Sequence, residues 1–195
     1  MNEASYEAVK TSIGRLVSLT EAEYEIFCGR LRLVELKKRE MLLHEGEICR
    51  EAFFINQGCL RYFFNQDGEE KCGQFFFENA WYADFYSFTT GKPTDENIQA
   101  LEPCQLFALS RESLNQLFEQ IPKLERWGRL IAENAFIGLK NVNSAYLNLS
   151  PTERYQALIK ERPKVIQRVP LQYIASYLGI QPESLSRIRR RLQNS

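Results

Sequence analysis

The sequence predicts an α+β fold with an N-terminal antiparallel β-roll of the jelly-roll type, a long dimerisation helix and a C-terminal helix-turn-helix domain. Three patterns predict this fold. Residues 33–109 hold short apolar stretches rich in Phe, Tyr and Ile, with turn residues about every ten positions, which indicates strands. Residues 123–149 carry a long helical pattern of apolar residues. Residues 169–192 hold two short helical patterns joined by a tight turn.

Composition fits a globular protein, and the two ends of the chain carry opposite net charges. The chain has 195 residues, 44% of them apolar and 26% charged, which is enough for one large domain or two small ones. The formal net charge is zero, but from Pro151 onward there are nine Lys or Arg and three Asp or Glu, a net charge of +6. The first 150 residues carry a net charge of −6. This asymmetry indicates that only the C-terminal part meets a polyanion.

Neither targeting nor disulfide chemistry is indicated. The N-terminal segment has early acidic residues and lacks the unbroken apolar core of a signal peptide, and no later stretch approaches a membrane span. We therefore expect a cytoplasmic protein without a membrane partner. The cysteines are odd in number and form no C-x-x-C motif, so we expect reduced thiols, mostly in the core. They are Cys28, Cys49, Cys59, Cys72 and Cys104.

The segments on either side of the roll read as helices. Residues 5–31 are predicted to be helical, with Thr20 and Glu23 in a capping-box pattern. Turn sequences at residues 45–47, 56–58, 65–68 and 90–93 separate the strands, and a short turn is expected near residues 81–88. Helix returns at Ser110, and Pro122 ends or restarts it.

The long helix carries two apolar lines. The first has the 4-3-4-3-4 spacing of a coiled-coil seam with small side chains, and we expect it to pair two chains in parallel about a two-fold axis. The second, Phe136, Leu139 and Tyr146, is expected to pack on the β-roll. The alternative is one helix buried within a single chain; because both faces are apolar, we expect a homodimer. The seam residues are Ile131, Ala135, Gly138, Val142, Ala145 and Leu149.

A boundary follows the long helix. Ser150 and Glu153 fit a capping box, and Pro151 fits the first position of a new helix. A helix that restarts here, after one that ends near Asn148, would form a hinge. The predicted domains are therefore 1–110 for the roll, 111–149 for the linker and dimerisation helix, and 150–195 for the helix-turn-helix domain.

The last segment has the pattern of a DNA-reading helix pair. Gly179 follows the apolar face formed by Ile174, Ala175 and Leu178, and Pro182 suits the first turn of a second helix. Leu185, Ile188 and Leu192 form the predicted buried stripe of that helix. We expect base reading by Glu183, Ser186 and Arg187, and phosphate contacts by Ser184, Arg189, Arg190 and Arg191. The alternative is a solvated basic face that touches no DNA.

This order of elements resembles the Crp/Fnr family of bacterial transcription regulators. The segment Glu183-Ser184-Leu185-Ser186-Arg187 is similar to the family's Glu-Thr-hydrophobic-Ser-Arg recognition start, and Glu45-Gly46-Glu47 and Phe54–Gly58 match its turn glycines. The resemblance implies a cyclic-nucleotide-binding-like sensor domain, a homodimer and double-stranded DNA with a TGA-like palindromic site. It also implies RNA polymerase as a partner. Because the sequence stops at Ser195, we expect no β-hairpin wing, with Arg189–Arg191 replacing its backbone contacts.

The ligand region departs from the family's pattern. Members that bind cyclic nucleotides have a Gly-Glu pair and, about ten residues on, an Arg-Ser or Arg-Thr pair that holds the phosphate. Here Ala83-Asp84 and Thr94-Asp95 occupy these places, and residues 63–110 contain no arginine. An aspartate repels a cyclic phosphate, so we expect no cyclic AMP and no cofactor. Tyr82 and these four residues form a candidate pocket for an apolar or uncharged effector, or aromatic side chains fill it.

Other function classes have weaker support. An iron–sulfur sensor needs closely spaced N-terminal cysteines, and Cys28 stands alone. A haem sensor or a metalloenzyme on the β-roll needs histidine ligands, and His44 is the single histidine. A ligand-binding or protein-interaction module without DNA binding stays open as an alternative. The leading hypothesis is a DNA-binding regulator that is not an enzyme.

Overall fold

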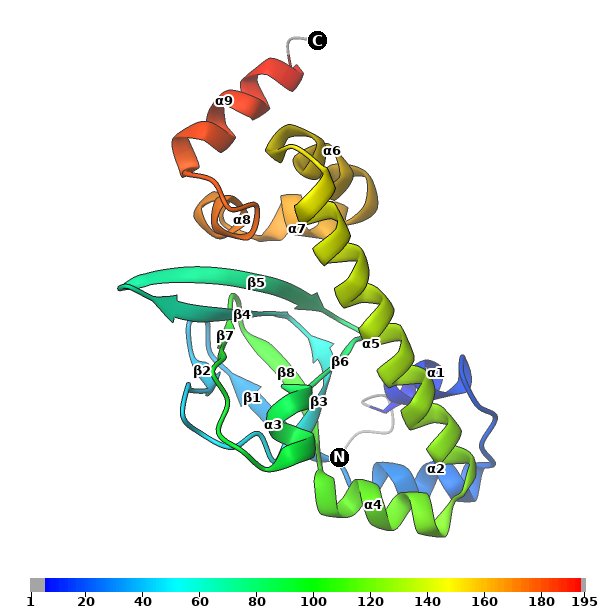
Figure 1. Ribbon diagram of the computed structural model, residues 1–195. Coiled ribbons are helices and arrows are strands. Elements are labelled where there is room, and N and C mark those ends of the chain that lie inside the picture. Colours follow the sequence, from blue (N-terminus) through cyan, green and yellow to red (C-terminus); the bar gives the residue numbers. More distant parts are fainter. Residues whose placement is uncertain (1–5, 194–195) are drawn as a thin grey trace. The chain divides into compact units, whose positions relative to one another are not determined.

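The computed structural model describes residues 6–193, and the contacts within the chain divide it into two compact units. One unit runs to Arg61 and resumes over Phe76–Ala135. The other contains Tyr62–Phe75 and the chain from Phe136 onward. Figure 1 shows the elements of both units along the chain.

Two four-stranded sheets form the roll, and the predicted strand region is confirmed (Figure 1). The first sheet has the order β1-β8-β3-β6, with β1 Arg32–Leu36, β8 Cys104–Ser110, β3 Glu51–Gln57 and β6 Trp81–Tyr82. The second has the order β2-β7-β4-β5, with β2 Met41–Leu43, β7 Asn97–Ala100, β4 Cys59–Gln66 and β5 Glu69–Phe77. A short helix, α3 Phe85–Thr90, lies where a turn was expected. The pairs β1/β8, β3/β8, β3/β6 and β2/β7 are antiparallel.

The turn after β3 requires its glycine. The β3/β8 register shifts between Ile55 and Gln57, and Gly58 follows with a φ of +104°. A Cβ at Gly58 would lie 2.5 Å from the Cys104 sulfur. Left-handed backbone and this close approach both exclude a side chain there, as the predicted turn implies.

Helices close one side of the first sheet. They are α1 Glu7–Gly14, α2 Glu21–Cys28, α4 Arg111–Gln120 and the first half of α5 Lys123–Asn148. Their apolar faces meet the sheet in one cluster that includes Phe27, Phe54, Leu117 and Trp127. The Trp127 ring lies 5.3 Å from that of Trp81 and 5.7 Å from that of Phe27, both edge-on. Burying each such ring contributes about 2–3 kcal/mol, so this cluster is the core of the unit.

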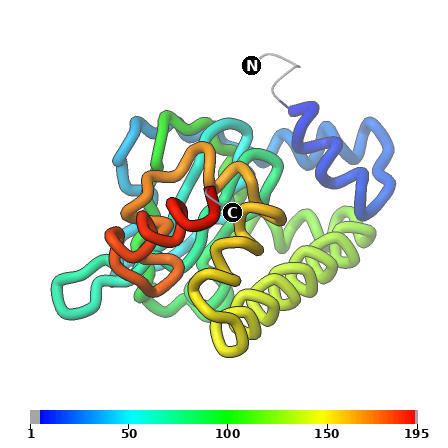
Figure 2. The backbone as a smooth tube through the Cα atoms, turned by 90° about the horizontal axis from the view of Figure 1, so that it is seen from above, coloured from blue at the N-terminus to red at the C-terminus, as the bar shows by residue number. Residues whose placement is uncertain are grey.

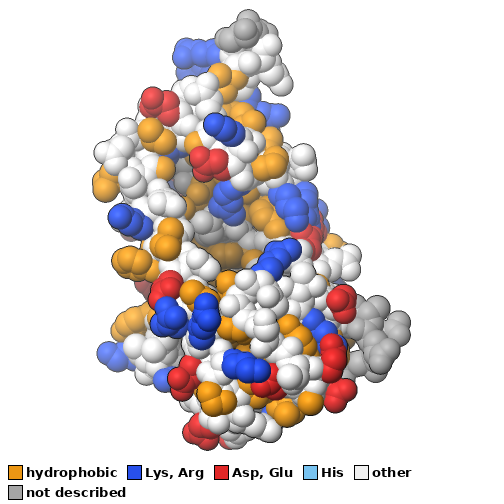
Figure 3. Space-filling view, turned by 90° about the vertical axis from the view of Figure 1, so that its right-hand side faces the viewer, with side chains coloured by type: hydrophobic (Ala, Val, Ile, Leu, Met, Phe, Trp, Pro, Cys, Tyr) orange, Lys and Arg blue, Asp and Glu red, His pale blue; other side chains and the backbone are white. Residues whose placement is uncertain are grey.

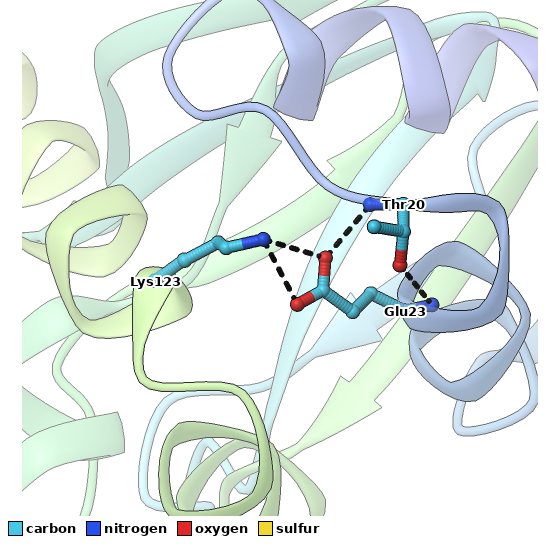
Figure 4. A network of polar contacts seen from close by, with 3 residues as sticks. All are labelled: Thr20, Glu23 and Lys123. Atoms are coloured by element: carbon cyan, nitrogen blue, oxygen red, sulfur yellow. Dashed lines mark hydrogen bonds and ion pairs between the residues drawn. The ribbon is translucent and has the colours of Figure 1, made fainter.

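The predicted capping box at Thr20 is confirmed and reaches further than expected (Figure 4). The Thr20 hydroxyl accepts from the Glu23 backbone N–H at 3.3 Å, and the Glu23 carboxylate accepts from the Thr20 N–H at 2.7 Å. The same carboxylate forms an ion pair with Lys123, the first residue of α5, at 2.9 Å. The Thr20 N–H, and then the Lys123 ammonium group, lower the pKa of Glu23. The cap therefore also joins α2 to α5.

The second unit is helical except for the β4–β5 hairpin. The second half of α5 leads to α6 Pro151–Glu161, α7 Pro163–Arg168, α8 Leu171–Tyr177 and α9 Pro182–Gln193. Figure 2 shows α5 as one continuous helix and the chain turning after it. The Ser150 capping box is confirmed, with Pro151 at the first helical position. Helix α7 was not predicted, because Pro163 was assigned to a helix end although it also suits a helix start.

The cysteines are free thiols, as predicted. All five are buried. Burial raises the pKa of Cys28 and of Cys49 to about 11, so both are protonated at neutral pH. Among residues 6–193, no helix is long and apolar enough to cross a membrane, and no group of three or more His, Cys, Asp or Glu side chains is arranged to hold a metal ion.

Candidate functional site

Helices α8 and α9 pack as a pair through the residues that the sequence pattern assigned to their buried faces. Ile174, Ala175 and Leu178 are buried, and so is Leu185, while Ile188 and Leu192 are half-buried. The turn between the helices contains Gly179, with a φ of +68°. An added Cβ there would lie 3.2 Å from the Tyr146 hydroxyl oxygen. A residue other than glycine would therefore be strained in both backbone and packing.

The opposite face of α9 is polar and exposed. Glu183, Ser186 and Arg187 are exposed and, at i, i+3 and i+4, lie on one face of the first turns. The Arg187 guanidinium donates to the Ser184 hydroxyl at 3.1 Å, which holds the arginine side chain along the helix. Figure 3 shows Lys and Arg side chains on the surface next to the C-terminal end.

The predicted phosphate contacts divide into two groups. Arg190 and Arg191 are exposed, as a phosphate contact requires. Arg189 is half-buried, because it follows Leu185 by four residues and shares its inward face. The structure therefore favours Arg190 and Arg191 over Arg189 for contacts outside the chain.

The β4–β5 hairpin lies against α8 within the second unit (Figures 1 and 2). Strand β5 is an edge strand, and Ser176 of α8 satisfies two of its backbone groups. The Ser176 hydroxyl accepts from the Cys72 N–H at 2.9 Å and donates to the Glu70 carbonyl at 2.8 Å. An exposed strand edge is prone to pair with strands of other chains. The Ser176 hydroxyl therefore satisfies two backbone groups of an edge that would otherwise be exposed. Sequence patterns gave no sign of this contact.

Two further side chains join the hairpin to the helices. Arg162, which follows α6, donates to the Phe75 carbonyl at 2.6 Å and to the side-chain oxygen of Gln74. The Phe75 ring lies 5.5 Å from the Tyr177 ring of α8. The positively charged Arg162 guanidinium thus donates hydrogen bonds to two neutral oxygens of the hairpin.

Arg154 of α6 connects the ends of two other helices. Its guanidinium donates to the carbonyls of Tyr146 and Leu178 at 2.9 and 2.8 Å, and more weakly to that of Leu149 at 3.4 Å. It also lies 4.6 Å from the centre of the Tyr146 ring. Carbonyls at helix C-termini carry partial negative charge, so the cation stabilises the ends of α5 and α8 together.

The two apolar lines of α5 lie in different surroundings. Gly138, Val142 and Ala145 of the predicted seam line a cavity of about 340 Å³ together with residues of α6 and α8 of the same chain. Ile131 packs on the core of the first unit, Ala135 is exposed and Leu149 is half-buried. The expectation that the second line is buried is wrong. Its members are 56–69% exposed, and two neighbours are exposed with them: Phe136, Leu139, Tyr146, Ile137 and Leu147.

The polar side chains among the predicted ligand residues of the roll mostly form hydrogen bonds to nearby groups of the roll itself. Asp84 caps α3, with Oδ1 accepting from the N–H groups of Tyr86 and Ser87 at 3.1 and 3.3 Å. Thr94 is buried and accepts from the Glu96 N–H at 3.0 Å. Ala83 is half-buried and Asp95 is exposed. Asp84 therefore has a structural role in α3.

Sequence reasoning missed Glu96 beside this group. Tyr82, predicted for the pocket, is buried and donates its hydroxyl to the Glu96 carboxylate at 2.5 Å. Burial raises the pKa of Glu96 to about 7, and the charges of Asp84 and Asp95 add to the increase. The second Asp84 carboxylate oxygen is buried with no hydrogen-bond partner among the described residues. Negative charge therefore accumulates among the residues of the predicted pocket.

Sequence reasoning also missed Arg61, which lies two residues before the arginine-free segment 63–110. It is 1% exposed on β4 and donates from Nε and Nη2 to the Gln99 side-chain oxygen at 3.0 and 2.7 Å. The roll therefore holds a buried cation, bound to a neutral amide of the neighbouring strand.

Comparisons with known proteins agree with the roll and the order of elements. Residues 33–121 match the model of the cyclic nucleotide-binding domain. The potassium/sodium hyperpolarization-activated cyclic nucleotide-gated channel 1 of Rattus norvegicus is 21% identical over 154 residues, which are 73% of this chain and 16% of the channel. The chain thus spans a small part of such channels, and this likeness concerns one domain.

Solved structures extend the likeness to the helices. FixK2 from Bradyrhizobium japonicum superimposes with a TM-score of 0.74 at 16% identity, covering 84% of this chain and 85% of FixK2. A Eubacterium rectale protein described as a Crp/Fnr-family regulator gives 0.69 at 16% identity, with 90% and 84% coverage. At such identities the likeness shows the fold alone. Residues 33–121 therefore match the cyclic nucleotide-binding domain, within a fold that the chain shares with FixK2 and with this Eubacterium rectale protein.

Proposed function

We propose that this protein is a sequence-specific, DNA-binding transcription regulator in which α9 enters the major groove. The observation that carries the proposal is the division of α9 into two faces. Leu185 is fully buried against the helix pair, while Glu183, Ser186 and Arg187 project from its first turns. Helix-turn-helix proteins place this part of the second helix against base edges.

The exposed side chains suit base recognition. The guanidinium of Arg187 can donate two hydrogen bonds to O6 and N7 of guanine, and the carboxylate of Glu183 can accept from N4 of cytosine. The hydrogen bond from Arg187 to Ser184 already restricts the arginine side chain before DNA binds. Binding therefore costs less side-chain conformational entropy. Arg190 and Arg191 carry exposed charge toward the backbone phosphates.

A homodimer would place two such helices on one palindromic site. The exposed apolar side chains of α5 supply the interface, since Phe136, Leu139 and Leu147, spaced by three and eight residues, lie on one side of the helix. Parallel pairing of two α5 helices about a two-fold axis would place both recognition helices on one side, and successive major grooves require a spacing of about 34 Å between them. RNA polymerase is the expected partner on such a site.

Cyclic AMP is not the proposed effector. The negative residues Asp84, Asp95 and Glu96 cluster at the place where the resemblance puts the phosphate. An anionic ligand would add to a set of charges that already raises the pKa of Glu96. Calorimetry with cyclic AMP tests this point, and micromolar affinity would contradict it.

The direct test of DNA binding is fluorescence anisotropy with labelled random-sequence duplexes at several salt concentrations. We expect binding that weakens linearly with the logarithm of salt concentration, because phosphate contacts release counterions. The double variant Arg190→Gln/Arg191→Gln should reduce the slope, while Lys160→Gln, a charge change on α6, should reduce it less. If the anisotropy shows no salt-dependent binding to DNA, the protein would be a ligand-binding or protein-interaction module instead.

A further inference from the structure

The cavity between α5, α6 and α8 has the properties of a binding site. It measures about 340 Å³ and lies wholly within the second unit, with Gln74 of β5 at its border. Ligand sites of small molecules run from about 300 to 1,000 Å³ and are mostly apolar with a few polar groups. This cavity therefore has room for a small molecule of that kind.

Small residues make the cavity, which larger side chains would fill. Gly138 and Ala145 of α5 and Ala157 of α6 line the cavity, and nothing lies within 4 Å of a Cβ built on Gly138, which is exposed. Filling such a space would stabilise the protein, since empty apolar volume lowers the free energy of unfolding. The walls that surround the space are aliphatic, with Val142, Leu158 and Leu178 among them.

The charge of the lining favours an anion. Arg154 and Arg162 both line the cavity, and they donate hydrogen bonds to the neutral carbonyl oxygens of Tyr146, Leu178 and Phe75. Within residues 6–193 neither arginine forms an ion pair, and Nε of Arg154 is buried with no hydrogen-bond partner. Glu161 contributes one negative charge, so the charged lining residues sum to +1. A partly buried cation without a counterion is unfavourable, and a bound carboxylate would supply one.

We propose that this cavity binds a small organic monocarboxylate of about ten non-hydrogen atoms, with an apolar body. The apolar body lies among the aliphatic walls of α5 and α6, and the carboxylate meets the guanidinium groups of Arg162 and Arg154. Such a ligand contacts α5, α6 and α8 together, and so favours one arrangement of the hinge at Ser150. That consequence for DNA binding rests on the proposed function, whereas the ligand site itself does not.

The test uses the full chain and needs no DNA. Benzoate, phenylacetate and 4-methylpentanoate are titrated by saturation-transfer NMR alongside their neutral amides. We expect at least one acid to bind with a dissociation constant below about 10 mM, and about tenfold or more tighter than its amide, because a hydrogen bond to a charged group carries that difference. No saturable binding of any acid, or equal binding of acid and amide, would overturn the proposal.

Two variants locate the site. Ala157→Trp fills the cavity and should abolish the saturation transfer, whereas Gln156→Trp, at the adjacent exposed position of α6, should leave it unchanged. Arg162→Met should weaken the acid about tenfold and leave the amide unaffected. If Ala157→Trp fails to fold by circular dichroism, Ala145→Leu provides a smaller filling substitution on α5. Undiminished acid binding in a folded cavity-filled variant would contradict the assignment. The DNA titration is a separate measurement, so either proposal can fail alone.

Discussion

The hydroxyl of Ser176 on α8 donates a hydrogen bond to the Glu70 carbonyl of β5 at 2.8 Å. The same oxygen accepts from the Cys72 N–H at 2.9 Å, so one side chain serves both an acceptor and a donor of the strand edge. Helix α8 is the first helix of the pair that carries the proposed recognition helix. The hairpin and the helix pair are therefore joined by hydrogen bonds and not only by apolar contact.

Ser176→Ala should release the strand edge. Without the hydroxyl, the Cys72 amide loses its acceptor, and hydrogen exchange at this amide should accelerate about five- to tenfold, the equivalent of roughly 1 kcal/mol. Exchange followed by NMR or mass spectrometry measures this change. Gln172→Ala, an exposed change on the same helix, is the control. Equal exchange in both variants would show that the serine does not protect the strand.

Leu139→Glu should dissociate the proposed dimer. The Leu139 side chain is 62% exposed and lies between Phe136 and Leu147 on the apolar face, so a charge there would be buried on pairing. Sedimentation velocity should give monomers for this variant and dimers for Asn134→Glu on the other side of α5. Gly138→Glu distinguishes the two faces, because Gly138 is an exposed residue of the predicted seam. If Gly138→Glu dissociates the dimer and Leu139→Glu does not, the small-residue seam is the interface.

Stability should fall with rising pH through the titration of Glu96. Burial raises its pKa from 4.5 to about 7, so folding favours the protonated form. This contribution is fully present below about pH 4.5 and is lost as pH rises through about 7. The loss is at most about 3 kcal/mol, and less where solvent screens the partly buried carboxylate.

Glu96→Gln should remove this pH dependence. The amide oxygen can still accept from the Tyr82 hydroxyl and carries no charge, so urea denaturation at pH 5 and pH 8 should give more similar free energies of unfolding than in the wild type. Glu35→Gln, an exposed change on β1, should keep the wild-type difference. If Glu96→Gln shows the same difference in free energy of unfolding between pH 5 and pH 8 as the wild type and Glu35→Gln, the assignment to Glu96 is contradicted.

Local patterns in the sequence predicted much of this fold. The capping boxes at Thr20 and Ser150, the glycine turn at Gly58 and the strand region are local, because neighbouring residues determine them. The exposed face of α9 follows from helical period alone. The buried thiols follow from composition and the absence of paired motifs.

Features that depend on distant residues could not be predicted in this way. The helical period identifies two apolar lines on α5 but not what each line contacts, so the exposure of Phe136, Leu139 and Tyr146 could not be predicted. The pairing of Ser176 with Glu70 joins residues 106 positions apart, and serine at a helical position gives no sign of a partner. Glu96 acquires its raised pKa from burial and from the charges of Asp84 and Asp95, which only the folded chain brings about.

The central claim is that α9 reads base sequence through Arg187, and a binding-site selection with wild type and Arg187→Ala tests it most directly. The wild type should recover a palindrome with a G·C pair in each half-site. Arg187→Ala should lose the preference at that pair alone, at a cost of roughly 1–3 kcal/mol, while Gln172→Ala should keep it. Recovery of the same motif with the same G·C preference by Arg187→Ala would contradict the account.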